Sequence, residues 1–348
     1  MAHAAVDNRT PFSFEPLFLS DPDGQPLLVP MVKATYSLMP PSELLFAEEQ
    51  LPISIEGAYQ SDGDPSSYLY EPETAFIKQR TDVSLFGYAF CQNRGDSKVD
   101  VTLRVGDAIE KTVRVIGDRV WKRRLGIVDM TNPEPFEKIP LIYERAFGGW
   151  DAAEPDPLTS QFEPRNPVGV GFKRKEWEEG MPLPNLEDPK RPLKMYGDTP
   201  PPAGFGFISP HWQPRAQYAG TYDEKWEKER APLLPEDFDL RFFNAASPGL
   251  IAPEYLKGNE SVLIENASPR GTLSFDLPGV QPPKIRVQLR GREDAHLQTN
   301  LDTVIINTDE DLLLMLWRTN LVLRHGPHDV VAIEVTAEGA PLLPKPQV

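Results

Sequence analysis

The chain has little thiol or imidazole chemistry, with one cysteine (Cys91) and five histidines among 348 residues. A lone cysteine excludes an intramolecular disulfide framework and a thiolate metal cluster, and it suits a reducing compartment. His325 and His328 lie close in sequence, but with no defined third ligand they read as a surface turn rather than a metal site. We therefore expect no metal and no other cofactor.

Long apolar runs are also missing. No stretch approaches the 18 or so apolar residues that a membrane helix needs. The N-terminus lacks the basic and apolar regions of a signal peptide. Together with the single cysteine, these absences predict a cytoplasmic protein without a membrane partner.

Basic residues are scarce relative to acidic ones. Lys and Arg number 36 against 52 Asp and Glu, which gives a formal net charge of −16 and a sequence pI near 4.8. Such a balance argues against a nucleic-acid binder that neutralises phosphates and against a polybasic membrane-surface protein.

Familiar catalytic motifs are absent as well. The sequence holds no phosphate-binding P-loop, no dinucleotide fingerprint, no zinc-protease helix motif and no hydrolase nucleophile elbow. Two Gly-x-Gly fragments, at 169–171 and 204–206, lack the strand–helix context of a phosphate site and are interpreted as turn glycines. The sequence therefore offers no standard catalytic motif.

Proline, in contrast, is abundant, with 38 residues, and this excludes a mainly helical fold. Alternating apolar residues at 99–105 and 109–115 around Gly106-Asp107 predict a β-hairpin. Further short apolar segments predict strands at 27–38, 51–59, 82–90, 120–121, 261–266, 272–277, 285–289, 303–307, 312–318 and 330–336.

The middle of the chain is different in character. Thirteen prolines fall between Trp150 and Arg215, interleaved with aromatic residues, and this composition favours ordered loops over a linker. Thr221 is predicted to cap a short helix that runs to Arg230 and ends before Pro232. A second short helix is expected from Pro235 to Phe243.

These signals predict a mainly β protein with an antiparallel, sandwich-like framework and a few short helices. We expect a single domain over 1–348, with strand-rich parts at 12–143 and 260–336. The intervening residues 144–250 form a loop-rich insertion, which we expect to pack across one face.

Paired carboxylates offer the most direct enzymatic reading. Glu144 with Asp151, Glu187 with Asp188 and Asp237 with Asp239 each have an arginine nearby in the sequence or a glycine turn between them. A retaining glycosidase needs two close carboxylates in a groove. With 52 acids in the chain, however, structural ion pairs are the stronger explanation.

A series of strings through the middle resembles a known bacterial family. They are YERAFGGWD (143–151), NPVGVGF (166–172), LPNLE (183–187), PAGFG (202–206), WQPR (212–215), AGTYD (219–223) and LPEDFD (234–239), flanked by MVKATY (31–36), LDTV (301–304) and LWR (316–318). The series resembles a domain-of-unknown-function family encoded beside type VI secretion toxins and spike proteins.

This resemblance implies an adaptor or chaperone without chemistry of its own. Such a protein binds a secreted toxin and assists its loading onto the secretion spike, with a spike or PAAR-type tip protein as a second partner. It implies no catalytic residue, because none is known to us for the family.

We expect the insertion to carry the partner-binding surface. The candidate residues are Arg145, Trp150, Asn166, Asn185, Trp212, Arg215, Tyr222 and Asp223. For Arg145, Asn166 and Asn185 the stronger expectation is a structural one, because asparagine caps turns and arginine ties carboxylates. A carbohydrate-active enzyme and a structural component of the secretion apparatus remain alternatives.

Overall fold

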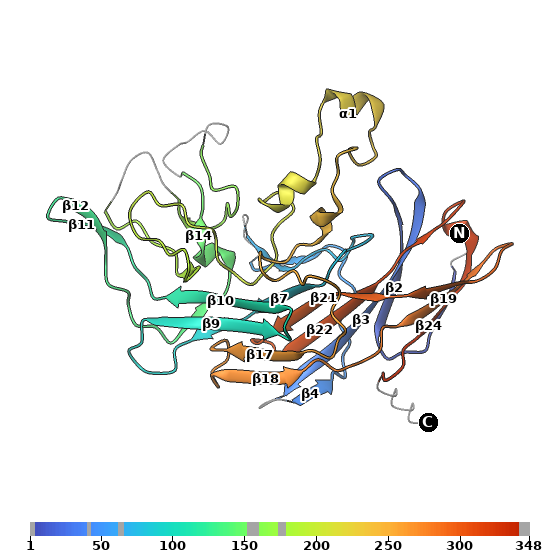
Figure 1. The fold of residues 1–348 in the computed structure, drawn as a ribbon, viewed down its shortest axis with the longest axis horizontal. Coiled ribbons are helices and arrows are strands. Elements are labelled where there is room, and N and C mark those ends of the chain that lie inside the picture. Colours follow the sequence, from blue (N-terminus) through green and yellow to red (C-terminus); the bar gives the residue numbers. More distant parts are fainter. Residues whose placement is uncertain (1–3, 40–42, 62–65, 152–159, 173–178, 341–348) are drawn as a thin grey trace.

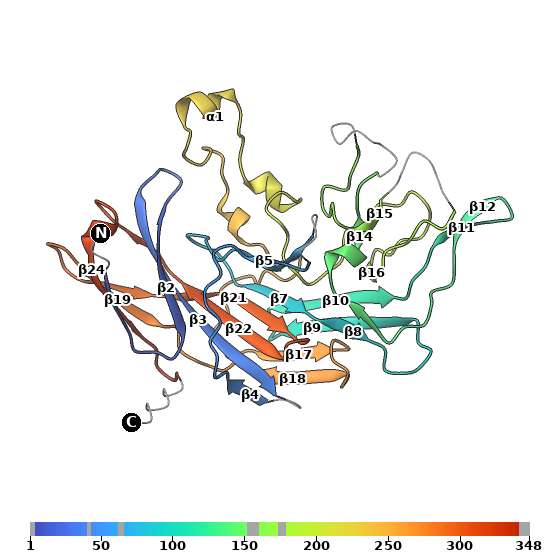
Figure 2. The ribbon, with the colours of Figure 1, turned by 180° about the vertical axis from the view of Figure 1, so that it is seen from behind.

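The structure is a computed structural model that describes residues 4–39, 43–61, 66–151, 160–172 and 179–340. Strands make up 40% of it and helices 6%, so the predicted mainly β fold is confirmed. Figure 1 shows an elongated strand scaffold with irregular loops standing on one side. Figure 2 shows the same arrangement from behind. No helix in the described ranges is long and apolar enough to cross a membrane.

The largest sheet has the strand order β2-β3-β22-β21-β7, with β4 and β23 also paired to β3. Its members are β2 (Ser13–Ser20), β3 (Pro26–Met39), β4 (Glu43–Phe46), β7 (Asp82–Phe86), β21 (Asn300–Asn307), β22 (Leu312–Arg318) and β23 (Leu321–Val322). All neighbours are antiparallel except β7 and β21.

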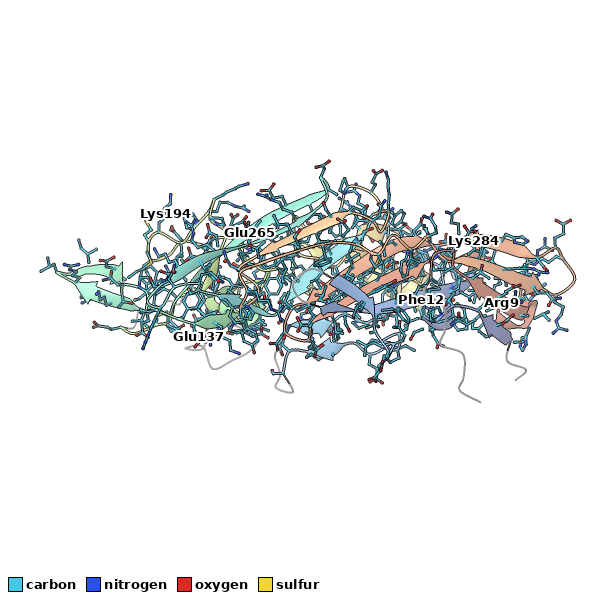
Figure 3. The ribbon with its side chains drawn as sticks, turned by 90° about the horizontal axis from the view of Figure 1, so that it is seen from below. Arg9, Phe12, Glu137, Lys194, Glu265 and Lys284 are labelled. Atoms are coloured by element: carbon cyan, nitrogen blue, oxygen red, sulfur yellow. The ribbon has the colours of Figure 1, made fainter. Side chains whose placement is uncertain are left out.

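Two smaller sheets complete the scaffold. The five-stranded sheet has the order β16-β10-β9-β17-β18, from β9 (Lys98–Val105), β10 (Ile109–Ile116), β16 (Leu186–Glu187), β17 (Ser261–Glu265) and β18 (Thr272–Asp276). The four-stranded sheet has the order β1-β24-β19-β20, from β1 (Ala5–Asn8), β19 (Lys284–Leu289), β20 (Ala295–Gln298) and β24 (Val330–Thr336). It forms the end of the molecule that carries Arg9 and Lys284 in Figure 3.

Four strand pairs stand apart from these sheets. They are β5 (Ala58–Tyr59) with β6 (Tyr68–Tyr70), β8 (Tyr88–Phe90) with β13 (Lys138–Pro140), β11 (Trp121–Arg124) with β12 (Ile127–Met130), and β14 (Phe147–Gly148) with β15 (Val170–Gly171). The helical elements are α1 (Glu224–Glu229) and the 3₁₀ turns η1 (Tyr143–Arg145), η2 (Arg215–Tyr218), η3 (Leu240–Phe243) and η4 (Pro327–Asp329).

Both faces of the seven-stranded sheet are buried, and β3 shows how. Leu28 and Val32 belong to the main apolar core, which also contains residues of the five- and four-stranded sheets. Val29 and Met31 point to the opposite face and pack in a second cluster with Phe76. Because successive strand residues face opposite sides, a strand covered on both faces reads as one continuous apolar run. This explains the run at 27–38.

The insertion helps to cover that second face. Phe207 is buried against Phe86 of β7, with ring centroids 5.8 Å apart. Leu240 and Phe243 of η3 pack against the cluster around Val29. These contacts agree with the expectation that the insertion packs across one face of the strand framework.

Three local predictions were wrong in detail. Of the strand expected at 51–59, only Ala58–Tyr59 is a strand, because Leu51 and Ile53 pack on the sheet without pairing. The helix expected from Thr221 is capped by Asp223, whose carboxylate accepts from Trp226 N. The helix expected from Pro235 to Phe243 is reduced to η3, capped by Asp239.

Candidate functional site

The eight candidate residues divide by burial. Asn166, Asn185, Trp212 and Arg215 are buried, whereas Arg145, Trp150, Tyr222 and Asp223 reach the surface. A partner protein cannot contact the first four without rearrangement of the loops around them. Only the exposed four remain available for recognition.

Asn166 and Asn185 fasten the insertion to the scaffold. Asn166 Nδ2 donates to the backbone oxygens of Tyr143, at 2.8 Å, and Phe147, at 3.0 Å. Asn185 Nδ2 donates at 2.9 Å to Ile116 O at the end of β10. Asn185 Oδ1 accepts from Arg145 Nη1 at 3.2 Å. These hydrogen bonds tie all three side chains into the insertion and the end of β10.

Trp212 and Arg215 hold the insertion against the sheet. Trp212 is 1% exposed, and its Nε1 lies 3.0 Å from His211 Nε2. Arg215 forms an ion pair with Glu71 and donates to the backbone oxygen of Phe242 at 2.7 Å. Each side chain is therefore occupied within the fold, and neither presents a free group to a partner.

Arg215 is part of a buried ionic cluster that the sequence did not lead us to expect. Its other members, between the seven-stranded sheet and its covering loops, are Lys33, Glu71, Glu73, Lys78, Asp82, Asp302 and Arg318. Four cations thus face four carboxylates. The one feature of the sequence that points to this cluster is Lys33, a lysine inside an apolar run.

The electrostatics of this cluster are those of a closed structural site. Lys33 Nζ lies 2.8 Å from Glu73 Oε1, and Lys78 Nζ lies 2.7 Å from Asp82 Oδ2. Burial raises the pKa of Glu71, although Arg215 and Lys78 oppose the shift. The cavity that the cluster's carboxylates Glu71 and Glu73 line holds only about 10 Å³. It cannot admit a substrate, so the perturbed carboxylate is not by itself a catalytic group.

The carboxylate pairs of the enzymatic reading are also engaged in loop contacts. Glu144 accepts from Ser67 N at 2.7 Å, and buried Glu187 lies 2.6 Å from Arg119 Nη2. Hydrogen bonds from Thr221 lower the pKa of Asp237. A glycosidase acid requires the opposite shift, so these contacts favour a structural role for the pairs.

The described residues contain no group of three or more His, Cys, Asp or Glu side chains that could hold a metal. His325 Nδ1 instead lies 3.1 Å from Asp329 Oδ1. Asp329 also accepts hydrogen bonds from the backbone of residues 324 and 325. The His-Gly-Pro-His segment is therefore a turn fastened by one carboxylate.

A short hairpin projects from the scaffold, far from the end that carries the N-terminus (Figures 1 and 2). This hairpin, which we call the finger (residues 121–130), consists of β11 and β12 joined by Leu125 and Gly126. Leu125 is 98% exposed and Ile127 is 70% exposed. The finger thus carries two apolar side chains into solvent at its tip.

The backbone at the fingertip is strained. Leu125 has φ of 49° and Gly126 has φ of 84°, as in a type I′ turn, which prefers Asn-Gly or Gly-Gly. A leucine in this region costs about 1 kcal/mol. An exposed, strained leucine contributes little to the core, and strain of this kind concentrates at functional positions.

The base of the finger is anchored by a buried side chain, and its stem is basic. Trp121 is buried in a small core with Met181 and Leu183. Lys122 and Arg124 follow on β11, so the finger adds positive charge to a strongly acidic chain. Sequence reasoning missed this element, although the signal of three consecutive cations before Leu-Gly-Ile was present.

Two further aromatic groups are exposed on the insertion. Trp150 stacks on Phe162 with centroids 4.4 Å apart, and both rings remain partly exposed. Tyr222 meets the edge of Trp226 at 4.7 Å. Aromatic residues on exposed loops are the residue type that contributes most to protein interfaces.

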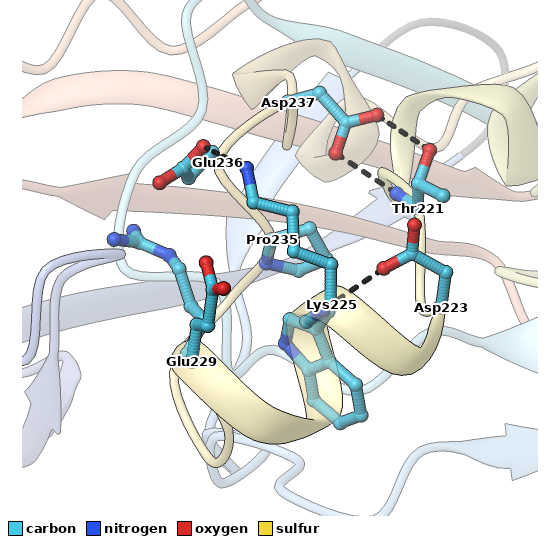
Figure 4. Close-up of a pocket in the computed structure, with 9 residues that line it drawn as sticks. Thr221, Asp223, Lys225, Glu229, Pro235, Glu236 and Asp237 are labelled. Carbon is cyan, nitrogen blue, oxygen red and sulfur yellow. Dashed lines mark hydrogen bonds and ion pairs between the residues drawn. The ribbon is translucent and has the colours of Figure 1, made fainter.

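Tyr222 and Asp223 belong to a projecting arm (residues 221–237). A cavity of about 260 Å³ lies on this arm, bounded by α1 and by residues 235–237. Figure 4 shows the residues that line it. Thr221 closes the neck of the arm, donating from N and Oγ1 to Asp237 at 2.9 and 2.7 Å. Opposite charges line the cavity, and Lys225 Nζ lies 3.8 Å from Glu236 Oε2.

A family model described as an uncharacterized protein conserved in bacteria, DUF2169, matches residues 23–318. The chain belongs to the DUF2169 family. No curated protein and no solved structure matches it.

The DUF2169 match covers every string on which the sequence resemblance rests, from 31–36 to 316–318. It also covers the finger, the arm and the buried ionic cluster. The expected membership of a bacterial family of unknown function is therefore confirmed. The DUF2169 description assigns no activity, partner or cellular location.

Proposed function

We propose that this protein is a non-enzymatic cytoplasmic adaptor or chaperone of a type VI secretion system. It binds a toxic effector and assists its loading onto the secretion spike, with a spike or PAAR-type tip protein as the second partner. The resemblance of the ordered strings suggests the pathway. The exposed surface of the molecule supports a binding role.

The observation that carries the proposal is the placement of exposed apolar groups on stiff projections. Leu125, Ile127, Trp150 and Tyr222 are all at least 42% exposed. Each lies on a segment fixed at its base by buried side chains or hydrogen bonds. A preformed surface of this kind loses little conformational entropy on binding.

The polar character of these projections suits a reversible complex. A loading factor must release its cargo, and interfaces that dissociate are more polar than permanent ones. The finger combines Leu125 with Lys122 and Arg124, whereas the arm alternates acidic and basic residues. The bound carboxylate pairs favour this proposal over a carbohydrate-active enzyme.

The test is co-purification with the toxin encoded beside this gene. The toxin is co-expressed with the wild-type protein, with Leu125→Asn, and with the double variant Lys122→Glu/Arg124→Glu. We expect wild type to retain the toxin and both finger variants to retain at least tenfold less. Leu45→Asn, which changes an exposed leucine on β4, is the matched control and should behave as wild type.

The adaptor function and the assignment of the finger as a contact surface can be contradicted by two different results. If wild type retains no toxin, and deletion of the gene leaves toxin delivery unchanged, the adaptor function is wrong. If wild type retains the toxin and the finger variants do so equally well, the function stands. The assignment of the finger as a contact is then wrong.

A further inference from the structure

One edge of β10 is unpaired over half its length. β9 pairs with all of β10 on one side, whereas β16 pairs only with Arg114 and Val115 on the other. Ile116 N donates to Asn185 O on that outer side at 2.8 Å. Since backbone groups alternate along an antiparallel strand, Glu110 and Thr112 direct their N–H and C=O groups to the same outer edge. No strand among those described pairs with them there.

The unpaired edge faces a groove. Its volume is about 930 Å³, and it is lined by residues 110–113 of β10 and by the segments 188–191 and 201–203. The groove exists because the chain turns away from β10 directly after β16. Figure 1 shows β10 at the border of its sheet, beside the insertion.

The walls of the groove are rich in proline. Pro189, Pro201, Pro202 and Pro248 all line it. A proline has no backbone N–H, so these walls offer apolar contact without donors that would compete for the carbonyls of a bound backbone. Edge strands of this kind are templates for a further strand.

A lysine is aimed into the rim of the groove. Lys111 Nζ donates to Ser247 Oγ at 2.6 Å and to Pro248 O at 2.9 Å. Its Nζ also lies 5.9 Å from the centroid of the Phe205 ring. In the described part of the chain Lys111 forms no ion pair within 4 Å, so its charge has no anionic partner there. Burial lowers the pKa of Lys111 to about 7, against the opposing effect of Asp188. A carboxylate brought to this position would give Lys111 an anionic partner.

We propose that this groove binds an extended segment of a partner protein, which pairs with Glu110 and Thr112 as an additional strand and places an acidic side chain against Lys111. The inference rests on the proposed function only for the identity of that partner. Hydrogen bonds between the backbone of β10 and that of the partner segment supply affinity, and Lys111 supplies selectivity for an acidic residue within that segment. Such a short strand binds weakly enough to be released.

The test uses a phage-displayed library of random nonapeptides, selected on the intact chain. Selected peptides are synthesised with a fluorescent label, and their affinity is measured by fluorescence polarisation. The critical variant is Thr112→Pro, which removes an N–H that β9 does not use. Thr112→Val is its matched control, because it loses the same hydroxyl and keeps the N–H.

We expect selected peptides to carry an acidic residue and to bind Thr112→Val as they bind wild type. Thr112→Pro should bind them at least tenfold more weakly, and Lys111→Met should also weaken binding and reduce its dependence on salt. Hydrogen exchange in wild type, which requires no variant to fold, should slow over residues 110–112 on peptide binding.

The proposal is wrong if no peptide is selected, or if peptides bind Thr112→Pro and Thr112→Val equally. It is also wrong if exchange over 110–112 is unaffected by peptide. None of these results depends on the toxin, so they leave the adaptor function standing. Conversely, failure of the toxin to co-purify would contradict the adaptor function. The peptide experiment would still test whether the groove binds an extended segment.

Discussion

At the scale of single residues, the chain places charged side chains in two different environments, a buried cluster around Arg215 and the half-buried position of Lys111. In the cluster around Arg215 every cation has a carboxylate partner, whereas Lys111 has a hydroxyl, a carbonyl and the face of the Phe205 ring. Burial of a charge is costly unless a partner compensates it. The two environments should therefore respond differently to substitution.

Glu71→Gln should destabilise the protein by about 3 kcal/mol, because it leaves the Arg215 guanidinium buried without its carboxylate. The double variant Glu71→Gln/Arg215→Met should lose less than the sum of the two single losses, since it removes both charges. Urea unfolding of the four proteins measures this coupling. Additive losses would show that the ion pair does not hold the insertion.

Lys111 should give the protein a distinctive pH dependence. Its pKa is about 7 in the folded chain and close to 10.4 when unfolded. Between these values the unfolded state binds more protons, so stability rises with pH by at most about 1.4 kcal/mol per unit. Below pH 7 the side chain is charged in both states and its burial cost is fully present.

The measurement compares wild type with Lys111→Met by thermal unfolding across this range. Stability of wild type relative to the variant should rise from about pH 7 to about pH 10 and stay level below pH 7. A relative stability that is flat across the whole range would show that Lys111 is not desolvated.

Individual side chains were the least predictable feature from sequence. Trp150 and Trp212 occur in similar proline-rich surroundings, yet one stacks at the surface and the other is buried beside Tyr143. Likewise, Thr221 and Asp223 are both residue types that cap helices. Which of the two caps the helix depends on contacts between residues distant in the sequence, such as the hydrogen bond of Thr221 with Asp237.

At the scale of elements, local periodicity predicted the paired strands well. The hairpin of β9 and β10 follows from its alternation and its Gly-Asp turn. β2, which was not predicted, contains Pro16 in its middle, and proline ordinarily argues against a strand. β2 lies at the edge of its sheet, where an unpaired side tolerates proline.

The finger allows stability and function to be separated within one element. Leu125→Asn places the residue that a type I′ turn prefers at a strained position, and it removes no buried side chain. We expect a gain of about 0.5–1 kcal/mol, seen as a rise of about 1–2 °C in Tm. The same variant is expected to lose binding to the toxin.

Differential scanning calorimetry of Leu125→Asn checks this expectation, with Leu45→Asn again as the control. A leucine that served only the fold would give the opposite sign, a lower Tm. A higher Tm combined with lost binding would mean that the strain at the fingertip is retained for recognition.

At the scale of the whole molecule, the insertion has two parts with different roles. One part, which includes Phe207 and η3, covers the second face of the seven-stranded sheet. The other part, the arm, stands away from the scaffold and is closed at its neck by Thr221 and Asp237. The sequence predicted that the insertion lies on the sheet. It did not show which part covers the sheet and which part projects from it, because both parts are rich in proline and aromatic residues.

This division predicts unequal effects of removal. Phe207 is 1% exposed, so Phe207→Ala should cost about 3–5 kcal/mol through lost burial and a residual cavity. Replacing residues 222–236 by a short glycine-serine turn should lower Tm by less than half as much. The arm contributes mainly the partly buried Leu234 and the hydrogen bond from Arg230 Nη2 to Pro22 O.

Thermal unfolding and toxin co-purification of both variants test the division. The arm deletion should remain folded and lose toxin, whereas Phe207→Ala should lose stability first and binding only as it unfolds. If the arm deletion is the less stable of the two, the arm is part of the covering layer. The partner surface must then be sought on the finger and the β10 groove, since these lie on the scaffold independently of the arm.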